Sequence, residues 1–100
     1  MSVEEQFFHS LRAVSIHMIK HAEDMDAACA AVLKLYEDDQ WEDLPIEEQI
    51  AKLEELAPHL AEDSALGRYF SQYPHKWSKE RFHTLLTHLD AYLRELRSLR

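Results

Sequence analysis

The sequence has few of the residues that supply tight turns, with one glycine and three prolines among 100 residues. A β-rich fold needs many such turns, so this composition argues against strands. The lone glycine, Gly67, also excludes a glycine-rich phosphate-binding loop and the familiar nucleotide sites built on one. No serine lies in the Gly-x-Ser-x-Gly setting of a hydrolase nucleophile. We therefore expect a protein that is not an enzyme.

Cysteine and long apolar runs are equally scarce. A single cysteine cannot form an internal disulfide, which agrees with a reducing compartment. No apolar run approaches the length that a bilayer-spanning helix needs. The first residues are acidic and lack the basic flank and apolar stretch of a signal peptide. These features predict a cytoplasmic protein with no role in a membrane.

Basic residues are rare in the first two thirds of the chain. Residues 1–66 hold 16 acidic and 4 basic side chains, whereas residues 67–100 hold 3 acidic and 7 basic ones. The net charge of −8 makes binding to nucleic acid through the general field of the protein unfavourable. The spacing of Arg94, Arg97 and Arg100 fits the end of a helix, where cations favour the dipole. These arginines are also placed to face acidic residues of the same fold or of a second copy.

The strongest pattern is an apolar repeat near the N-terminus, with spacings of four and three and no glycine or proline inside it. Ser2 and Glu5 precede it as a capping box. The pattern predicts one helix, straight or bent, from Val3 to about Glu37, about 52 Å long if straight. That exceeds the diameter of roughly 33 Å for a compact domain of this size. The repeat comprises Phe7, Leu11, Val14, Met18, His21, Met25, Ala28, Val32 and Leu35.

Three further helices follow in the prediction. Pro45 opens one that carries an apolar stripe from Ile46 to Leu56 and ends near Pro58. A shorter helix covers residues 64–72, with Gly67 as a weak point. The last begins at Ser78 as N-cap, stapled by Trp77 and Phe82, and runs to the C-terminus. We thus expect one all-α domain over residues 1–100. It is a bundle of two long antiparallel helices with one or two short helices between them.

A second apolar stripe lies beside the first on the N-terminal helix, and it includes Phe8, Ile19 and Tyr36. One partner helix cannot cover so wide an apolar arc, so the remainder predicts a protein–protein contact, with a homodimer as the expected form. Tyrosine and tryptophan elsewhere add residue types that dominate binding hot spots. The predicted partner-binding residues are Phe8, Ile19, Tyr36, Trp41, Tyr69, Tyr73 and Trp77. For Trp41 and the residue 69–77 segment, packing in the core is the alternative interpretation.

A metal or haem site is the alternative function. His17, His21 and Asp24 project from one side of the first predicted helix and include zinc-ligand types. Glu80 and His83 add one Glu-x-x-His pair. A di-iron bundle uses two such pairs, so this sequence supplies half of them. Ordinary packing of histidines at the edge of the core explains the same pattern.

The function that the sequence favours is a small protein-binding regulator or adaptor without a cofactor. Chaperone-like, inhibitor and immunity-type proteins all belong to this class. An acidic bundle is also suited to neutralising a basic partner.

Overall fold

The computed structural model describes residues 2–21, 30, 32–35 and 37–100, and every regular element in them is helical. The all-α prediction is therefore confirmed. None of the helices in these residues is long and apolar enough to cross a bilayer. The elements are α1 (Val3–His21), the 3₁₀ turn η1 (Trp41–Asp43), α3 (Ile46–Leu56), the 3₁₀ turn η2 (Ala57–Leu60), α4 (Ala65–Gln72) and α5 (Lys76–Leu99).

Helix α1 begins as the sequence predicts. The Ser2 hydroxyl accepts a hydrogen bond from the backbone N–H of Glu5 at 3.1 Å, which satisfies one donor that the first helical turn leaves free. Glu4 and Glu5 lie in this turn, where carboxylates interact favourably with the helix dipole. The N-terminus of α1 is therefore both fixed and acidic.

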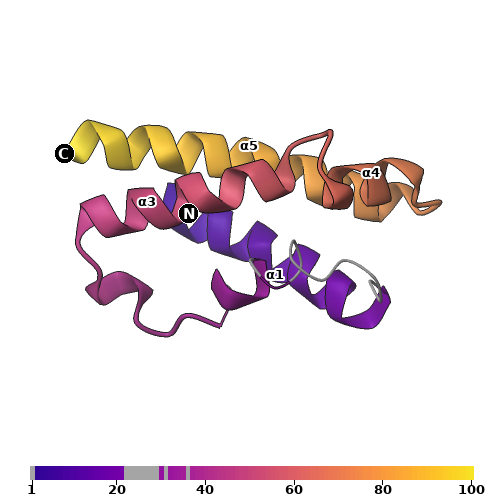
Figure 1. Cartoon of the computed structure of the whole chain (residues 1–100), viewed down its shortest axis with the longest axis horizontal. Helices are drawn as coiled ribbons and strands as arrows, with labels where there is room; N and C mark the ends of the chain where they lie inside the picture. The colour runs from indigo at the N-terminus through magenta and orange to yellow at the C-terminus, as the bar shows by residue number, and fades with distance from the viewer. Residues whose placement is uncertain (1, 22–29, 31, 36) are drawn as a thin grey trace.

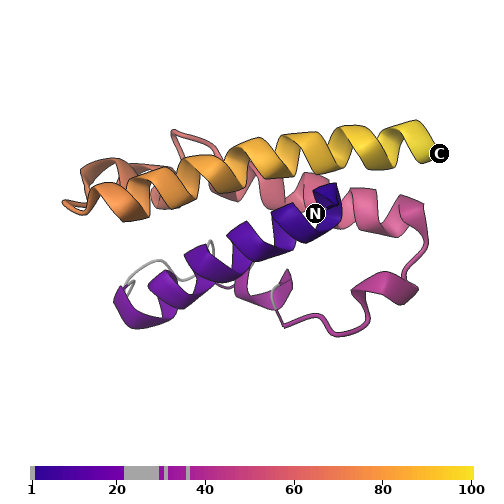
Figure 2. The same cartoon turned by 180° about the vertical axis from the view of Figure 1, so that it is seen from behind.

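The predicted helix from Val3 to Glu37 does not form as one straight rod. The Cα atoms span 40 Å along the longest axis of the molecule, which is shorter than the about 52 Å that such a helix needs. The described part of α1 ends at His21, and residues 32–35 form a separate helical segment that lies near α1 in both ribbon views (Figures 1 and 2). The predicted positions between them, Asp24 and Met25 included, lie outside the described residues.

Helix α5 is the longest of the described helices, and α1 lies along it (Figures 1 and 2). Three side-chain contacts define their register. The rings of Phe7 and Tyr92 lie 5.4 Å apart, and the Ser10 hydroxyl is hydrogen-bonded to Nδ1 of His88 at 2.6 Å. Nearer the other end, His17 contacts Ser78 of α5. Residue numbers therefore increase along α1 while the numbers of the α5 residues that they contact decrease.

The start of α5 differs from the prediction. The helix begins at Lys76 with His75 at the N-cap position, so Ser78 lies inside the first turn and is not the N-cap. Trp77 is 54 % exposed and stacks with the Arg81 guanidinium at 5.1 Å, which also makes the staple between Trp77 and Phe82 wrong. The physical reason is that the Ser78 hydroxyl faces His17 on α1, a distant partner that local pattern does not reveal.

The middle of the chain packs against the two long helices. Helix α3 ends at Leu56 as Pro58 predicts, and η2 leads to α4, whose N-cap Ser64 accepts a hydrogen bond from the Gly67 N–H. Two arginines near the C-terminus join α5 to α3. Arg97 pairs with Glu54 at 3.4 Å, and Arg100 pairs with Glu47 at 3.6 Å. The C-terminal basic residues thus serve their own fold.

One apolar core joins the helices, and it contains most of the predicted seam. Leu99 is an exception to the predicted stripe on α5, because it is 62 % exposed at the free end of that helix. The buried apolar residues are Phe7, Leu11, Val14, Met18, Val32, Leu35, Trp41, Ile50, Leu53, Leu56, Leu60, Leu66, Phe70, Phe82, Leu85, Leu89, Tyr92, Leu93 and Leu96.

Candidate functional site

An acidic groove lies between the N-terminal turns of α1 and the segment that leads into η1. It has a volume of about 470 Å³. Five of the eight described side chains that line it are carboxylates, and none of the eight is lysine, arginine or histidine. We call this the acidic groove, and its lining residues are Ser2, Glu4, Glu5, Phe8, Asp38, Asp39, Trp41 and Glu42.

Two aromatic rings form the apolar part of the groove. Phe8 is half-buried and meets the Trp41 ring edge-on, with 5.6 Å between the ring centroids. Trp41 is 3 % exposed, and its indole N–H donates a hydrogen bond to the Tyr92 hydroxyl at 3.2 Å. Trp41 therefore belongs to the core and also lines the groove. Its fixed position gives the neighbouring acidic side chains a rigid support.

One buried polar side chain fixes the wall of the groove. The Gln49 amide group donates hydrogen bonds to the backbone carbonyls of Trp41, at 2.9 Å, and of Leu44, at 3.2 Å. Buried carbonyls without a partner are costly, so this one side chain from α3 stabilises the short η1 turn. On the preceding side, Asp38 accepts a hydrogen bond from the Gln40 N–H and pairs with Lys52 at 3.8 Å.

The charges of the groove are poorly compensated. Burial raises the pKa of the Glu4 carboxyl above its usual value, and the neighbouring carboxylates of Glu42, Glu95 and Glu5 raise it further. Within the described part of the chain, Glu4, Glu5 and Glu42 have no lysine, arginine or histidine at ion-pair distance. A raised carboxyl pKa records that the ionised form is disfavoured, so a cation brought into the groove would relieve an existing repulsion.

A second cluster surrounds His17 where α1 meets α4 and α5. His17 is 7 % exposed, with Nε2 at 3.3 Å from the Tyr69 hydroxyl and Nδ1 at 3.3 Å from the Ser78 hydroxyl. Its ring also lies 5.1 Å from Phe70 and 4.7 Å from Tyr73. Because both ring nitrogens meet hydroxyl groups of the protein, this histidine joins three helices.

The predicted metal ligands are only partly described. The structure gives the backbone of His21, while its side chain and Asp24 lie outside the described residues. Among the described side chains, no group of three histidine, cysteine, aspartate or glutamate residues is placed to hold a metal ion. The contacts of His17 with Tyr69 and Ser78 agree with the packing interpretation, and the metal site stays a prediction.

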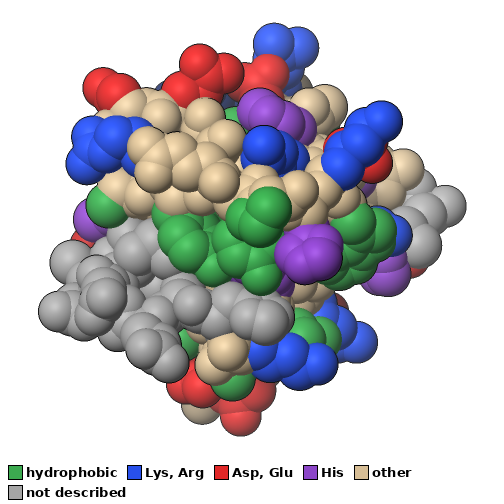
Figure 3. Space-filling model, turned by 90° about the vertical axis from the view of Figure 1, so that its right-hand side faces the viewer, with side chains coloured by type: hydrophobic (Ala, Val, Ile, Leu, Met, Phe, Trp, Pro, Cys, Tyr) green, Lys and Arg blue, Asp and Glu red, His purple; other side chains and the backbone are tan. Residues whose placement is uncertain are grey.

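The predicted partner-binding residues do not share one surface. Phe8 and Trp41 lie at the acidic groove, whereas Tyr69 and Tyr73 are half-buried around His17. Ile19, 63 % exposed on α1, and Trp77 are exposed apolar residues, and Tyr36 lies outside the described residues. Figure 3 views the end of the molecule that carries α4, where hydrophobic side chains gather at the centre with histidines and basic side chains around them.

The carboxylates of the groove were not predicted as a site. The sequence does place acidic residues beside both aromatic residues, with Glu4 and Glu5 before Phe8 and Glu42 after Trp41. Each run alone resembles a solvated helix end or connector. Their combination depends on the segment near residue 40 folding back onto the start of α1, which the local pattern does not specify.

Comparisons with known proteins give no match, so the function is inferred from the geometry of the site. No protein-family model, no curated protein and no solved structure matches this chain.

Proposed function

We propose that this protein is a small non-enzymatic binding protein that receives a cationic segment of a protein partner in the acidic groove. The observation that carries the proposal is a hollow whose described lining holds five carboxylates, two aromatic residues and no basic residue. Arginine and lysine side chains match it in charge, and their stems match its apolar part. Of the regulator classes, an inhibitor or immunity-type protein fits best, because its action is to neutralise a basic surface.

The energetics favour a cationic side chain over a neutral one. Trp41 is 3 % exposed, so the half-buried Phe8 ring is the one that a guanidinium or ammonium group can contact, and such a contact gains about 0.5–1 kcal/mol. Exposed ion pairs add about 0.2–1 kcal/mol each. The protein's charge of −8 also attracts a basic partner before contact, which mainly raises the association rate.

The size of the groove limits the kind of segment. Its volume of about 470 Å³ lies in the lower part of the roughly 300–1,000 Å³ range of ligand pockets. That space suits one or two long side chains of an extended segment or loop, and it is too small for the whole face of a helix. The proposal therefore predicts an arginine- or lysine-containing loop as the ligand.

Association into a homodimer remains a separate prediction. The exposed isoleucines Ile16 and Ile19 lie one turn apart on α1, with exposed fractions of 42 % and 63 %. A shared apolar contact between two copies would cover them. Light scattering after size-exclusion chromatography tests this point, and an Ile19→Lys variant should shift a dimer to a monomer. A wild-type protein that elutes only as a monomer contradicts it.

Binding to a defined peptide tests the groove. The probe is a short peptide of alternating arginine and glycine, and its control replaces each arginine with neutral citrulline. The groove variant combines Glu5→Gln and Glu42→Gln, both exposed side chains without described ion pairs. The matched variant, Glu62→Gln with Asp63→Asn, removes the same charge from the exposed loop before α4.

We expect the groove variant to weaken peptide binding about two- to thirtyfold, the combined effect of two exposed ion pairs. The matched variant should change the affinity less than about twofold, because charges beyond a Debye length of about 8 Å are screened at physiological salt. Citrulline should abolish binding. Equal weakening by the two variants would show general attraction to an acidic protein and would contradict the proposed groove.

A further inference from the structure

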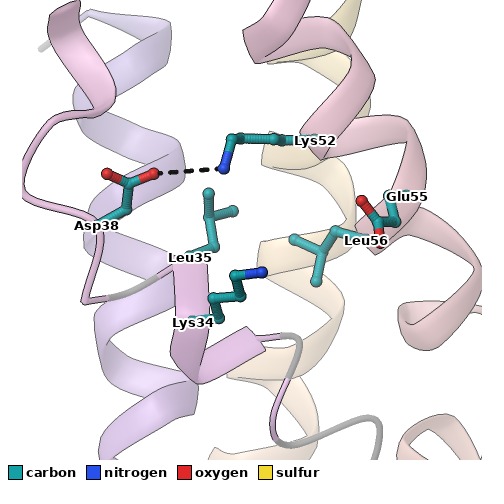
Figure 4. A pocket seen from close by; sticks show the side chains of 6 residues that line it. All are labelled: Lys34, Leu35, Asp38, Lys52, Glu55 and Leu56. Carbon is teal, nitrogen blue, oxygen red and sulfur yellow. Dashed lines mark ion pairs between the residues drawn. The ribbon is translucent and has the colours of Figure 1, made fainter. Parts of the chain in front are cut away.

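A second hollow lies between Lys34, Leu35 and Asp38 on one side and the C-terminal half of α3 on the other (Figure 4). Its volume is about 190 Å³, more than ten times the roughly 10–15 Å³ that one water molecule requires. It is smaller than the roughly 300–1,000 Å³ pockets of drug-sized ligands. The described residues that line it are Lys34, Leu35, Asp38, Lys52, Glu55 and Leu56.

The lining combines an apolar centre with charges of both signs. Leu35 and Leu56 are 6 % and 3 % exposed, and they face each other from opposite walls (Figure 4). Lys52 reaches across the hollow to Asp38, so these two charges already compensate each other at 3.8 Å. A ligand therefore meets this pair as a neutral unit.

Two charges in the lining are uncompensated. Among the described residues, neither Lys34 nor Glu55 has an oppositely charged side chain at ion-pair distance. Lys34 extends from the residue 32–35 segment, and Glu55 lies beside Leu56 on α3 (Figure 4). The hollow thus offers one ammonium group on one wall, one carboxylate on the other, and apolar side chains between them.

We propose that this hollow binds a free apolar α-amino acid. The carboxylate of the ligand pairs with Lys34, its ammonium group pairs with Glu55, and its side chain contacts Leu35 and Leu56. A simple anion would satisfy Lys34 but would be repelled by Glu55, and a simple cation would meet the reverse situation. The described lining side chains carry two positive and two negative charges, so a zwitterion of this size matches them best. The site is independent of the proposed function, although Asp38 lines both hollows.

The test titrates the ¹⁵N-labelled full chain with L-leucine and records amide shifts. N-acetyl-L-leucine lacks the ammonium group and L-leucinamide lacks the carboxylate, so each removes one charge. We expect L-leucine to shift the amides of residues 34–38 and 52–56 with a Kd of about 1–10 mM. Each analogue should bind about two- to fivefold more weakly, the effect of one exposed ion pair.

Two variants assign the charges. Lys34→Gln should remove the preference for leucine over leucinamide, and Glu55→Gln should remove the preference over N-acetyl-leucine. The controls Lys20→Gln and Glu62→Gln, on exposed residues outside the hollow, should keep both preferences. The proposal is overturned if leucine causes no shifts up to its solubility limit, or if the shifts lie outside these two segments. Equal binding of N-acetyl-leucine and leucine to the wild type would indicate a carboxylate site and would also overturn it.

Discussion

Replacing Gly67 with alanine should destabilise the protein, although helix propensity alone predicts the opposite. Gly67 is buried in α4, and alanine is about 1 kcal/mol more favourable than glycine inside a helix. A Cβ atom at this position would collide with the backbone carbonyl oxygen of Ala61 and would lie 2.7 Å from that of Glu62. The backbone of one of the two segments must therefore move.

The expected cost follows from these contacts. Overpacking typically costs about 1–3 kcal/mol, and two collisions with backbone atoms place the Gly67→Ala variant near the upper end of that range. Subtracting the gain in propensity leaves a net loss of about 2 kcal/mol. For a protein of this size, that loss lowers Tm by roughly 8–16 °C.

Thermal unfolding followed by circular dichroism measures this effect, and urea unfolding gives the free energy independently. Ser71→Ala is the matched variant, because Ser71 is exposed on the same helix and gains helix propensity without a collision. It should leave Tm unchanged or slightly raised. A Gly67→Ala protein as stable as the wild type would refute the close packing of α4 against residues 61–62.

Three other substitutions test single contacts. Ser15→Ala should stabilise the protein by about 1 kcal/mol in urea unfolding, because the buried Ser15 hydroxyl has no hydrogen-bond partner among the described residues. Gln49→Ala should cost about 1–3 kcal/mol in the same assay, because it leaves the carbonyls of Trp41 and Leu44 without this donor. Folding raises the pKa of Glu4, so the ionised carboxylate lowers the free energy of unfolding. This loss is fully present at pH values above the raised pKa and absent at pH values below the usual 4.5. Glu4→Gln should therefore raise Tm at neutral pH, and the gain should fade as the pH falls below 4.5; a gain that grows in acid would contradict this sign.

The apolar periodicity predicted the core because burial acts on whole helix faces. Phe7, Leu11 and Val14 on α1 are buried, as are Leu85 and Leu89 on α5. Each of these positions follows from spacing within one helix, which sequence reveals directly. The caps at Ser2 and Ser64 were predictable for the same reason, since their partners lie three residues away.

Features that depend on distant partners were not predictable in this way. Ser78 has the residue type of an N-cap, yet it faces His17, which lies 61 positions earlier. Gly67 resembled a weak point in a helix, but its missing side chain permits the contact with the residue 61–62 loop. The acidic groove required the segment around Trp41 to lie against the start of α1, where Trp41 contacts Phe8 and also donates a hydrogen bond to Tyr92 of α5, both distant in sequence.

The location of a bound basic peptide tests the proposed groove most directly. Amide and indole spectra of the ¹⁵N-labelled protein should be recorded with and without the arginine–glycine peptide. The largest shifts should occur in residues 2–8 and 38–42 and at the indole N–H of Trp41, while that of Trp77 stays in place. Shifts concentrated at Ile16, Ile19 and Trp77, with Trp41 unmoved, would contradict the account.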